Sequence, residues 1–141
     1  MAVRELRRAA VWCVVVACAC AAPRYAPCPV GLAGALPADA FAVCREVLRQ
    51  RYGDVAVADV DTFRLQSGWV PVQDPPGERR ATIVRDDSGR APDLAVVVEL
   101  RRVSVPLLGA PGWTTPRGDD AAERDLAQAL RAALAPATAG R

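Results

Sequence analysis

The spacing of apolar residues predicts a helix in the first half of the chain. From Pro37 to Gly53, apolar side chains recur at every third or fourth position, and charged side chains occupy the opposite positions. Pro37 suits the first helical turn, where its missing N–H is not needed, and Asp39 complements the helix dipole there. Gly53 suits the position after a helix end, because it adopts left-handed conformations easily. We therefore expect one amphipathic helix between Pro37 and Gly53.

A second amphipathic pattern lies near the end of the chain, from residue 119 to residue 135. Ala and Leu form one apolar stripe along it, and Pro136 ends it. We expect Asp119 or Asp120 to cap this helix. Asp120 and Glu123 also have the spacing of a capping box, with Asp in place of the usual Ser or Thr.

The region between the two helices shows the alternation of apolar and polar residues that is typical of strands. Four segments carry this alternation, at residues 55–60, 63–71, 79–86 and 94–105. Turn sequences rich in Asp, Pro and Gly separate them, and a longer Gly- and Pro-rich loop at 106–118 leads to the last helix. This order predicts an α+β fold, in which an N-terminal and a C-terminal helix pack on one face of an antiparallel sheet of about four strands.

Two tryptophans lie in or beside these predicted strands. The alternation within 63–71 places Trp69 in the core, whereas Trp113 lies in the long loop. Trp113 either pins this loop onto the sheet or offers an exposed aromatic contact. Aromatic residues are enriched where binding energy concentrates.

Two pairs of arginines flank the predicted strands, Arg79-Arg80 and Arg101-Arg102. Neighbouring residues on a strand point to opposite faces, so one member of each pair could join Arg85 in an exposed stripe. Such a stripe would suit anionic lipid head groups or an acidic partner, and ion pairs at the strand edges are the alternative. We predict partner contacts at Trp113, Arg80, Arg101 and Arg102.

The first 22 residues have the build of an export signal. Arg4, Arg7 and Arg8 precede an apolar run from residue 9 to residue 22, with small residues near its end. This run is shorter than the about 20 apolar residues that a membrane-spanning helix needs. We therefore expect export; a buried apolar helix or an uncleaved anchor is the alternative.

The segment Val15-Val16-Ala17-Cys18 resembles the lipobox of bacterial lipoproteins. The resemblance implies that Cys18 carries fatty acyl chains such as palmitate and becomes the first residue of the mature protein. Val15 is a departure, because the family usually has Leu there. Cys20 is the second choice for acylation, and an ordinary cleavage after Ala21 or Ala22 is the rival prediction.

The composition excludes several classes of function. The chain has 18 Lys and Arg, all of them Arg, against 16 acidic residues, and removal of residues 1–17 leaves 15 of each sign. A net charge of zero does not favour a nucleic-acid partner. The chain has no His, which excludes Ser–His and Cys–His catalytic pairs and makes a metal site improbable.

Carboxylate pairs are the remaining candidates for acid–base chemistry. They are Asp59/Asp61, Asp86/Asp87 and Asp119/Asp120. Each pair lies at a predicted turn or helix start, where Asp is favoured for local hydrogen bonding. We therefore expect no catalytic residues, no metal and no cofactor.

Three cysteines remain after Cys18 in the mature chain: Cys20, Cys28 and Cys44. Exported chains meet oxidising conditions, and a disulfide between Cys28 and Cys44 would tie the N-terminal segment to the first helix. Free, small apolar thiols are the alternative.

The predicted organisation is a signal peptide at 1–17, a lipidated Cys with a Pro-, Gly- and Ala-rich tether at 18–36, one domain at 37–135 and a flexible tail at 136–141. The pattern Gly53-Asp-Val-Ala-Val-Ala-Asp followed by Arg64-Leu-Gln-Ser-Gly-Trp69 resembles the helix-grip domains of BamC-like lipoproteins, over about residues 40–105. Those lipoproteins accompany outer-membrane assembly machinery. The chain also resembles small LptE-like lipoproteins, which support lipopolysaccharide export.

These resemblances imply a lipid-anchored, non-enzymatic interaction module that faces the periplasm, on the outer membrane. Its partners would be the membrane, through the anchor, and an envelope protein. The alternative is a soluble exported domain that binds a small ligand between the sheet and the helices. An enzyme would need two carboxylates converging in a cleft.

Overall fold

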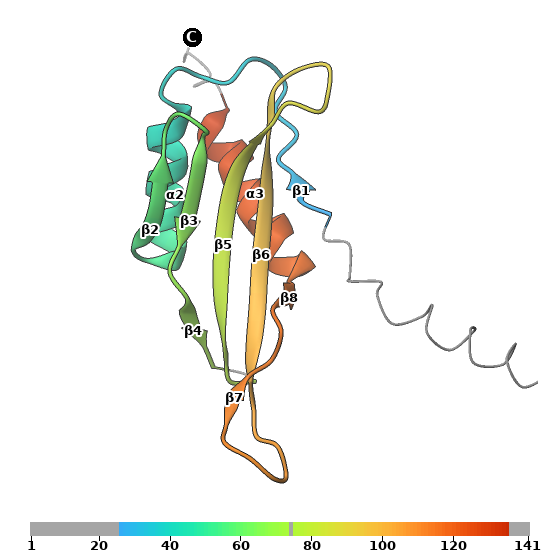
Figure 1. Cartoon of the computed structure of the whole chain (residues 1–141). Helices are drawn as coiled ribbons and strands as arrows, with labels where there is room; N and C mark the ends of the chain where they lie inside the picture. Colours follow the sequence, from blue (N-terminus) through green and yellow to red (C-terminus); the bar gives the residue numbers. More distant parts are fainter. Residues whose placement is uncertain (1–25, 74, 136–141) are drawn as a thin grey trace, which may run out of the picture.

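The protein folds as two helices and one antiparallel sheet, which confirms the α+β prediction (Figure 1). The computed structural model describes residues 26–73 and 75–135, so the predicted signal peptide, Cys18, Cys20 and the 136–141 tail lie outside the described residues. The elements are β1 (Cys28–Pro29), α2 (Ala40–Tyr52), β2 (Val55–Asp59), β3 (Arg64–Ser67), β4 (Val70–Val72), β5 (Gly77–Asp86), β6 (Asp93–Ser104), β7 (Gly112–Trp113), β8 (Arg117–Gly118) and α3 (Asp120–Leu134).

The sheet is built around the long hairpin of β5 and β6. These strands pair from Gly77↔Arg102 to Asp86↔Asp93. On one side β5 pairs with β3 and β4, and β3 pairs with β2. On the other side β1, β8 and β7 follow one another along the outer edge of β6. The prediction of about four strands was therefore too low, because β1, β4, β7 and β8 are too short to show an alternating pattern.

Both helices pack against one face of the sheet and form the core with it. Alternate residues of β5 and β6 supply one half of this core and the inward stripes of the helices supply the other. The buried set includes Ala81, Ile83, Leu94, Val96, Val98, Cys44, Leu48, Leu126 and Leu130. Burying a Val, Leu or Ile side chain of this core stabilises the fold by about 1.5–3 kcal/mol.

The predicted strand at 63–71 is interrupted after Ser67. The Ser67 hydroxyl accepts a hydrogen bond from the Ala81 N–H at 3.0 Å and donates one to the Gly68 carbonyl at 2.8 Å. The Ser67 side chain thus replaces a backbone partner in the hydrogen-bond ladder with β5. The chain then rejoins the sheet as β4, in which Val70 lies opposite Arg79. The interruption changes which face the following residues occupy.

The helix starts differ from prediction in detail. The Pro37 carbonyl accepts from the Ala40 N–H at 3.0 Å, and α2 begins at Ala40. Asp119 caps α3 and accepts from the Ala122 N–H at 3.1 Å. The predicted capping box is not formed, because Glu123 accepts a hydrogen bond from the Val98 N–H of β6 at 3.0 Å instead.

The predicted tether at 18–36 was wrong for its second half. The Val30 N–H donates to the Leu94 carbonyl at 2.8 Å, and the Val30 side chain is fully buried. The N–H groups of Gly31 and Leu32 both donate to the Asp93 carboxylate. These contacts make residues 28–32 part of the domain, despite their Pro- and Gly-rich composition.

The predicted Cys28–Cys44 disulfide is not formed, and both residues are free thiols. Cys28 lies on β1, which contacts β6 and α3, whereas Cys44 lies on the inward face of α2, which contacts β2, β3 and β5. Burial raises the pKa of the Cys44 thiol to about 12. Within 26–73 and 75–135, no helix is long and apolar enough to cross a membrane.

Candidate interaction surface

The face of the sheet opposite the helices has no described element packed on it (Figure 1). Strand alternation places on this face the residues of β5 and β6 that do not contribute to the core. They are Glu78, Arg80 and Thr82 on β5 and Val97, Glu99 and Arg101 on β6. We call this surface the open face.

Two tryptophan rings enclose one arginine on the open face. The guanidinium carbon of Arg101 lies 4.1 Å from the ring centroid of Trp69 and 4.4 Å from that of Trp113. The guanidinium carbon of Arg80 lies 4.6 Å from the Trp69 centroid. Each such cation–π contact contributes about 0.5–1 kcal/mol at an exposed site.

Two carboxylates neutralise these arginines. The Arg101 Nε donates to Glu78 Oε2 at 2.9 Å, and the Arg80 Nε donates to Glu99 Oε2 at 2.8 Å. All four charged side chains are about three-quarters buried, so their geometry is well fixed. The six residues Trp69, Glu78, Arg80, Glu99, Arg101 and Trp113 form a unit that we call the tryptophan–arginine cluster.

Strand register explains how distant residues meet in this cluster. Glu78 lies opposite Arg101, and Arg80 lies opposite Glu99, in the β5–β6 hairpin. The β4 register brings Trp69 beside Arg80, and pairing of Trp113 with Val103 brings its ring beside Arg101. Trp113 packs on Arg101 and remains 46% exposed.

The structure unites three of the four predicted partner contacts and separates the fourth. Arg80, Arg101 and Trp113 lie in the cluster, whereas Arg102 points to the other face and donates to the Pro75 carbonyl. At the far end of β5, the Arg85 Nε lies 2.7 Å from the Asp87 Oδ1 and forms an ion pair with it. Arg80, Arg85 and Arg101 therefore follow the alternative prediction of ion pairs, whereas Arg102 does not, and these residues form no continuous basic stripe along β5 and β6.

Trp69 was placed wrongly by the sequence reading, which assigned it to the core. The alternation was extended through residues 67–70, where the structure breaks the strand. The Ser67-Gly68 dipeptide is a turn signal that could have indicated the break. The change of face that follows puts Trp69 on the open face.

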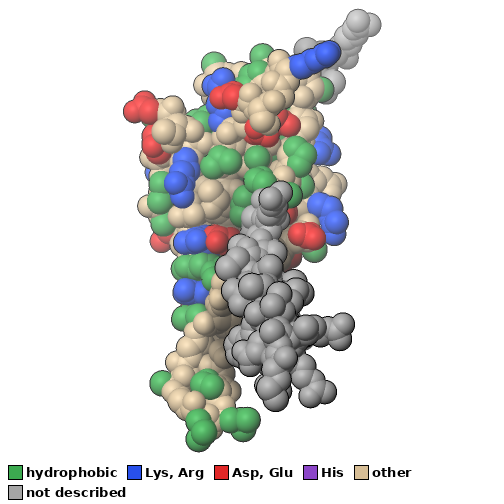
Figure 2. All heavy atoms as spheres, turned by 45° about the vertical axis from the view of Figure 1, so that its right-hand side comes forward, with side chains coloured by type: hydrophobic (Ala, Val, Ile, Leu, Met, Phe, Trp, Pro, Cys, Tyr) green, Lys and Arg blue, Asp and Glu red, His purple; other side chains and the backbone are tan. Residues whose placement is uncertain are grey.

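An apolar loop projects from the end of the sheet beside the cluster. Residues 105–113, here called the apolar loop, consist only of Val, Pro, Leu, Gly, Ala and the final Trp113. Leu107 and Leu108 are fully exposed, at 104% and 95%, and Val105 is 73% exposed. Figure 2 shows apolar side chains at this tip, away from the compact body. Large exposed apolar patches commonly mark a binding surface.

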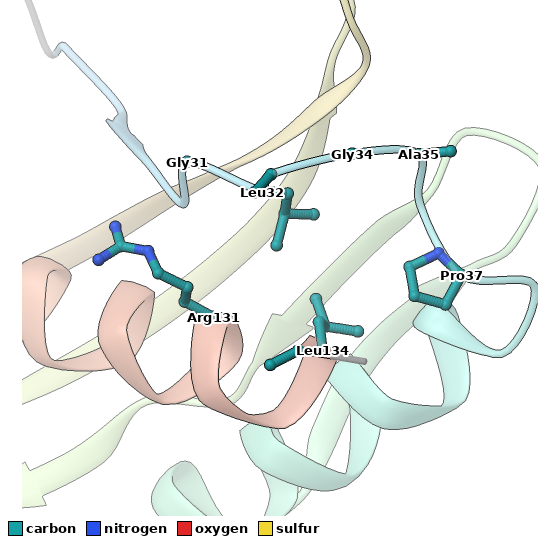
Figure 3. Close-up of a pocket in the computed structure, with 9 residues that line it drawn as sticks. Gly31, Leu32, Gly34, Ala35, Pro37, Arg131 and Leu134 are labelled. Carbon is teal, nitrogen blue, oxygen red and sulfur yellow. The ribbon is translucent and has the colours of Figure 1, made fainter. Parts of the chain in front are cut away.

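A small hollow lies between the 31–37 segment and the end of α3 (Figure 3). Its volume is about 300 Å³, and apolar groups of Leu32, Pro37 and Leu134 line most of it. Arg131 lies at one side, and its Nε donates to the Val30 carbonyl at 2.8 Å. The hollow is therefore beside the N-terminal segment rather than between the sheet and the helices.

The three candidate carboxylate pairs lie at separate places in the fold, and at least one carboxylate of each pair is engaged by a hydrogen bond or an ion pair. Asp59 accepts from the Thr62 hydroxyl at 2.7 Å and from the Asp61 N–H at 3.0 Å, and the Thr62 bonds lower the pKa of Asp59. Hydrogen bonds from Ser88 lower the pKa of Asp86. Asp119 caps α3 and pairs with Arg79 at 2.7 Å. In the described parts of the chain, no three His, Cys, Asp or Glu residues group as metal ligands would.

Comparisons with protein-family models, with curated proteins and with solved structures found no match. What this protein does must therefore be argued from its own surface chemistry. Three features are available for that argument: the tryptophan–arginine cluster, the apolar loop and the hollow beside α3.

Proposed function

We propose that the protein is a lipid-anchored, non-enzymatic module of the bacterial cell envelope, which binds an envelope protein through its open face. The observation that supports protein binding is the stack of Arg101 between Trp69 and Trp113 on an uncovered sheet. Tryptophan and arginine are the residues in which interface binding energy most often concentrates. The lipobox-like segment ending at Cys18 supports the anchor.

The cluster is ordered before any partner arrives. Ion pairs hold both arginines, and the arginines in turn hold the Trp69 ring. A preordered surface loses less side-chain entropy on binding, so more of the contact energy remains as affinity. The cluster offers two aromatic rings, Trp69 and Trp113, on the open face.

The charges of the cluster indicate what kind of partner fits. Arg80 and Arg101 are balanced by Glu99 and Glu78, so the cluster is electrically neutral. We therefore expect a partner that presents apolar or aromatic side chains rather than an acidic patch. Binding of this kind depends only weakly on salt, because screening acts mainly on exposed, unbalanced charges.

Photo-crosslinking in cells tests the protein-binding part of the proposal. A photoreactive residue at Val97, on the open face, should form a discrete crosslinked product that is lost in Trp69→Ala. The matched control places the same residue at Arg45, an exposed position on α2. Equal crosslinks from both positions, or none from Val97, would contradict binding through the open face.

The intact mass of the membrane-extracted mature protein tests the anchor. The expected chain begins at Cys18 and carries acyl mass, and Cys18→Ala loses that mass and leaves the membrane fraction. Facing the periplasm from the outer membrane is part of the same proposal, and fractionation of the two membranes checks it. An unmodified chain that starts near Ala22 would refute the anchor.

The hollow beside α3 favours a second candidate function, a soluble exported domain that binds a small apolar ligand. Its lining combines apolar groups with the cationic Arg131. Native mass spectrometry of the purified protein would then show a bound molecule that is absent from Leu32→Trp, because the Leu32 side chain points into the hollow toward Leu134 (Figure 3). This function replaces the first if Cys18 is unmodified and such a molecule is present.

A further inference from the structure

We infer that the apolar loop, residues 105–113, inserts into the head-group region of the membrane that carries the lipid anchor. Its tip residues Leu107 and Leu108 contact no described neighbour that shields them, being 104% and 95% exposed. Between residue 105 and residue 113 the only polar side-chain group is the indole N–H of Trp113. A projecting tip of this composition is suited to the apolar environment of a lipid bilayer.

The direction of β1 turns its N-terminal end toward the end of the sheet that carries the apolar loop. β1 is antiparallel to β6, with Cys28 opposite Val96. The N-terminal end of β1 therefore points toward the end of the sheet at which β6 leaves for the apolar loop (Figure 1). β1 and the apolar loop are thus arranged so that one membrane surface can meet both the anchor and the loop.

Chain length allows both contacts at once. Ten residues separate Cys18 from Cys28, which gives a contour of at most about 36 Å. From Val96 to Ser104, where the loop begins, β6 advances eight residues, or about 26 Å. An acylated Cys18 can thus reach the level of the loop without displacing β1.

Charge at the base of the loop also fits a lipid surface. Residues 100–118 contain three arginines and no acidic residue. Arg101 is balanced by Glu78, but the structure records no carboxylate partner, among the residues it describes, for Arg102 or Arg117. Basic residues near an anionic leaflet favour binding and hold the apolar groups at the interface.

The backbone limits the depth of insertion. N–H and C=O groups of an irregular loop cannot enter the hydrocarbon core without partners, so the loop reaches only the boundary between head groups and acyl chains. Pro106 and Pro111 reduce the number of N–H groups to be satisfied. Trp113, at the base of the loop, belongs to the residue type that is enriched at this interface.

Quenching of Trp113 fluorescence by brominated lipid tests the inference directly. The full chain carries Trp12→Phe and Trp69→Phe, so that Trp113 is its only tryptophan, and the vesicles contain phosphatidylglycerol and dibrominated phosphatidylcholine. We expect quenching of Trp113 in this protein. In the chain lacking the anchor, the double variant Leu107→Ser and Leu108→Ser should bind the vesicles at least about 10-fold more weakly. The control Val60→Ser, at a position 64% exposed in the β2–β3 turn, should change neither.

The test is made with Cys18 and with Cys18→Ala, which separates the loop from the anchor. The inference rests on the proposed function in one respect only, namely that the loop and the anchor contact the same membrane. Quenching in either form supports the insertion of the loop, whatever the mass of the mature protein shows. Membrane-bound protein without quenching of Trp113 would overturn the inference, and the loop would then be assigned to a protein partner.

Discussion

Arg101 organises the open face of the sheet at the scale of single residues. Its guanidinium contacts two tryptophan rings and one carboxylate at the same time. Its neighbour Arg102 has the same side chain but points to the other face, where it bonds one backbone carbonyl. The two adjacent residues therefore form a natural test pair.

Arg101→Ala should destabilise the protein by about 1–3 kcal/mol in urea unfolding. The change removes two cation–π contacts and leaves the partly buried Glu78 carboxylate without its partner. Arg102→Ala should cost less than about 0.5 kcal/mol, because it removes only one exposed contact. Equal losses for the two variants would contradict the cluster as described.

Cys44 should resist alkylation in the native protein. Burial raises the pKa of its thiol to about 12, and only the thiolate reacts with iodoacetamide. At pH 8 we expect Cys28, which is partly exposed, to be labelled first, with Cys44 labelled only after unfolding. Mass mapping of the labelled peptides measures this order; similar native rates would mean that α2 opens readily from the sheet.

At the scale of elements, the outer edge of β6 is covered by several short pieces rather than by one strand. β1 and β8 leave a gap at Val98, and α3 fills it. The Val98 N–H donates to Glu123 at 3.0 Å, and the Val98 carbonyl accepts from the Asp119 N–H at 2.8 Å. The start of α3 thus completes the edge pairing and discourages the addition of a foreign strand.

Glu123 should make stability fall as pH rises. Burial raises its folded pKa above the ordinary carboxyl value, so the folded state retains the proton over a range in which the unfolded state has lost it. The contribution of Glu123 to stability is fully present below the ordinary carboxyl pKa. It is lost as the pH rises from there to the raised pKa of the folded state. Urea unfolding from pH 4 to pH 8 should show wild type weakening relative to Glu123→Gln, which does not titrate.

Glu46 gives stability the opposite pH dependence, but it does not change the comparison of wild type with Glu123→Gln. Hydrogen bonds from Arg49 and Gln50 lower the pKa of Glu46 to about 2, so its contribution is present above the ordinary carboxyl pKa and lost as pH falls. Wild type and Glu123→Gln share this contribution, and it cancels in their difference. A constant difference across the range would refute the assignment to Glu123.

At the scale of the whole molecule, the N-terminal segment belongs to the folded domain. Val30 lies in the core between β6 and α3, and Arg131 of α3 holds its carbonyl. The described fold thus begins near Cys28, ten positions after Cys18. Under the proposed anchor at Cys18, this distance would limit how far the domain can lie from the membrane.

Val30→Ala should therefore cost about 2 kcal/mol of folding free energy. The matched control is Val105→Ala, which makes the same chemical change at an exposed position in the apolar loop and should be nearly neutral. Thermal and urea unfolding of the two variants measure the difference. A neutral Val30→Ala would restore residues 28–36 to a tether.

The parts of this protein that depend on local periodicity follow from the order of its amino acids. The helices, the β5–β6 hairpin and most of their inward residues follow from apolar spacing, because a long amphipathic element has only one way to bury its stripe. Strand alternation is also a local rule, so the sequence predicted that only one member of each pair, Arg79-Arg80 and Arg101-Arg102, points to a given face.

Only the tertiary structure decided the features that depend on register between distant segments. The break at Ser67 moved Trp69 from the expected core to the open face, and β7 pairing carried Trp113 to Arg101. The short strands β1, β4, β7 and β8 exist because partners on β5 and β6 satisfy their backbones, and two or three residues contain no period of their own. The tryptophan–arginine cluster is therefore set by pairing across the sheet, which local sequence does not encode.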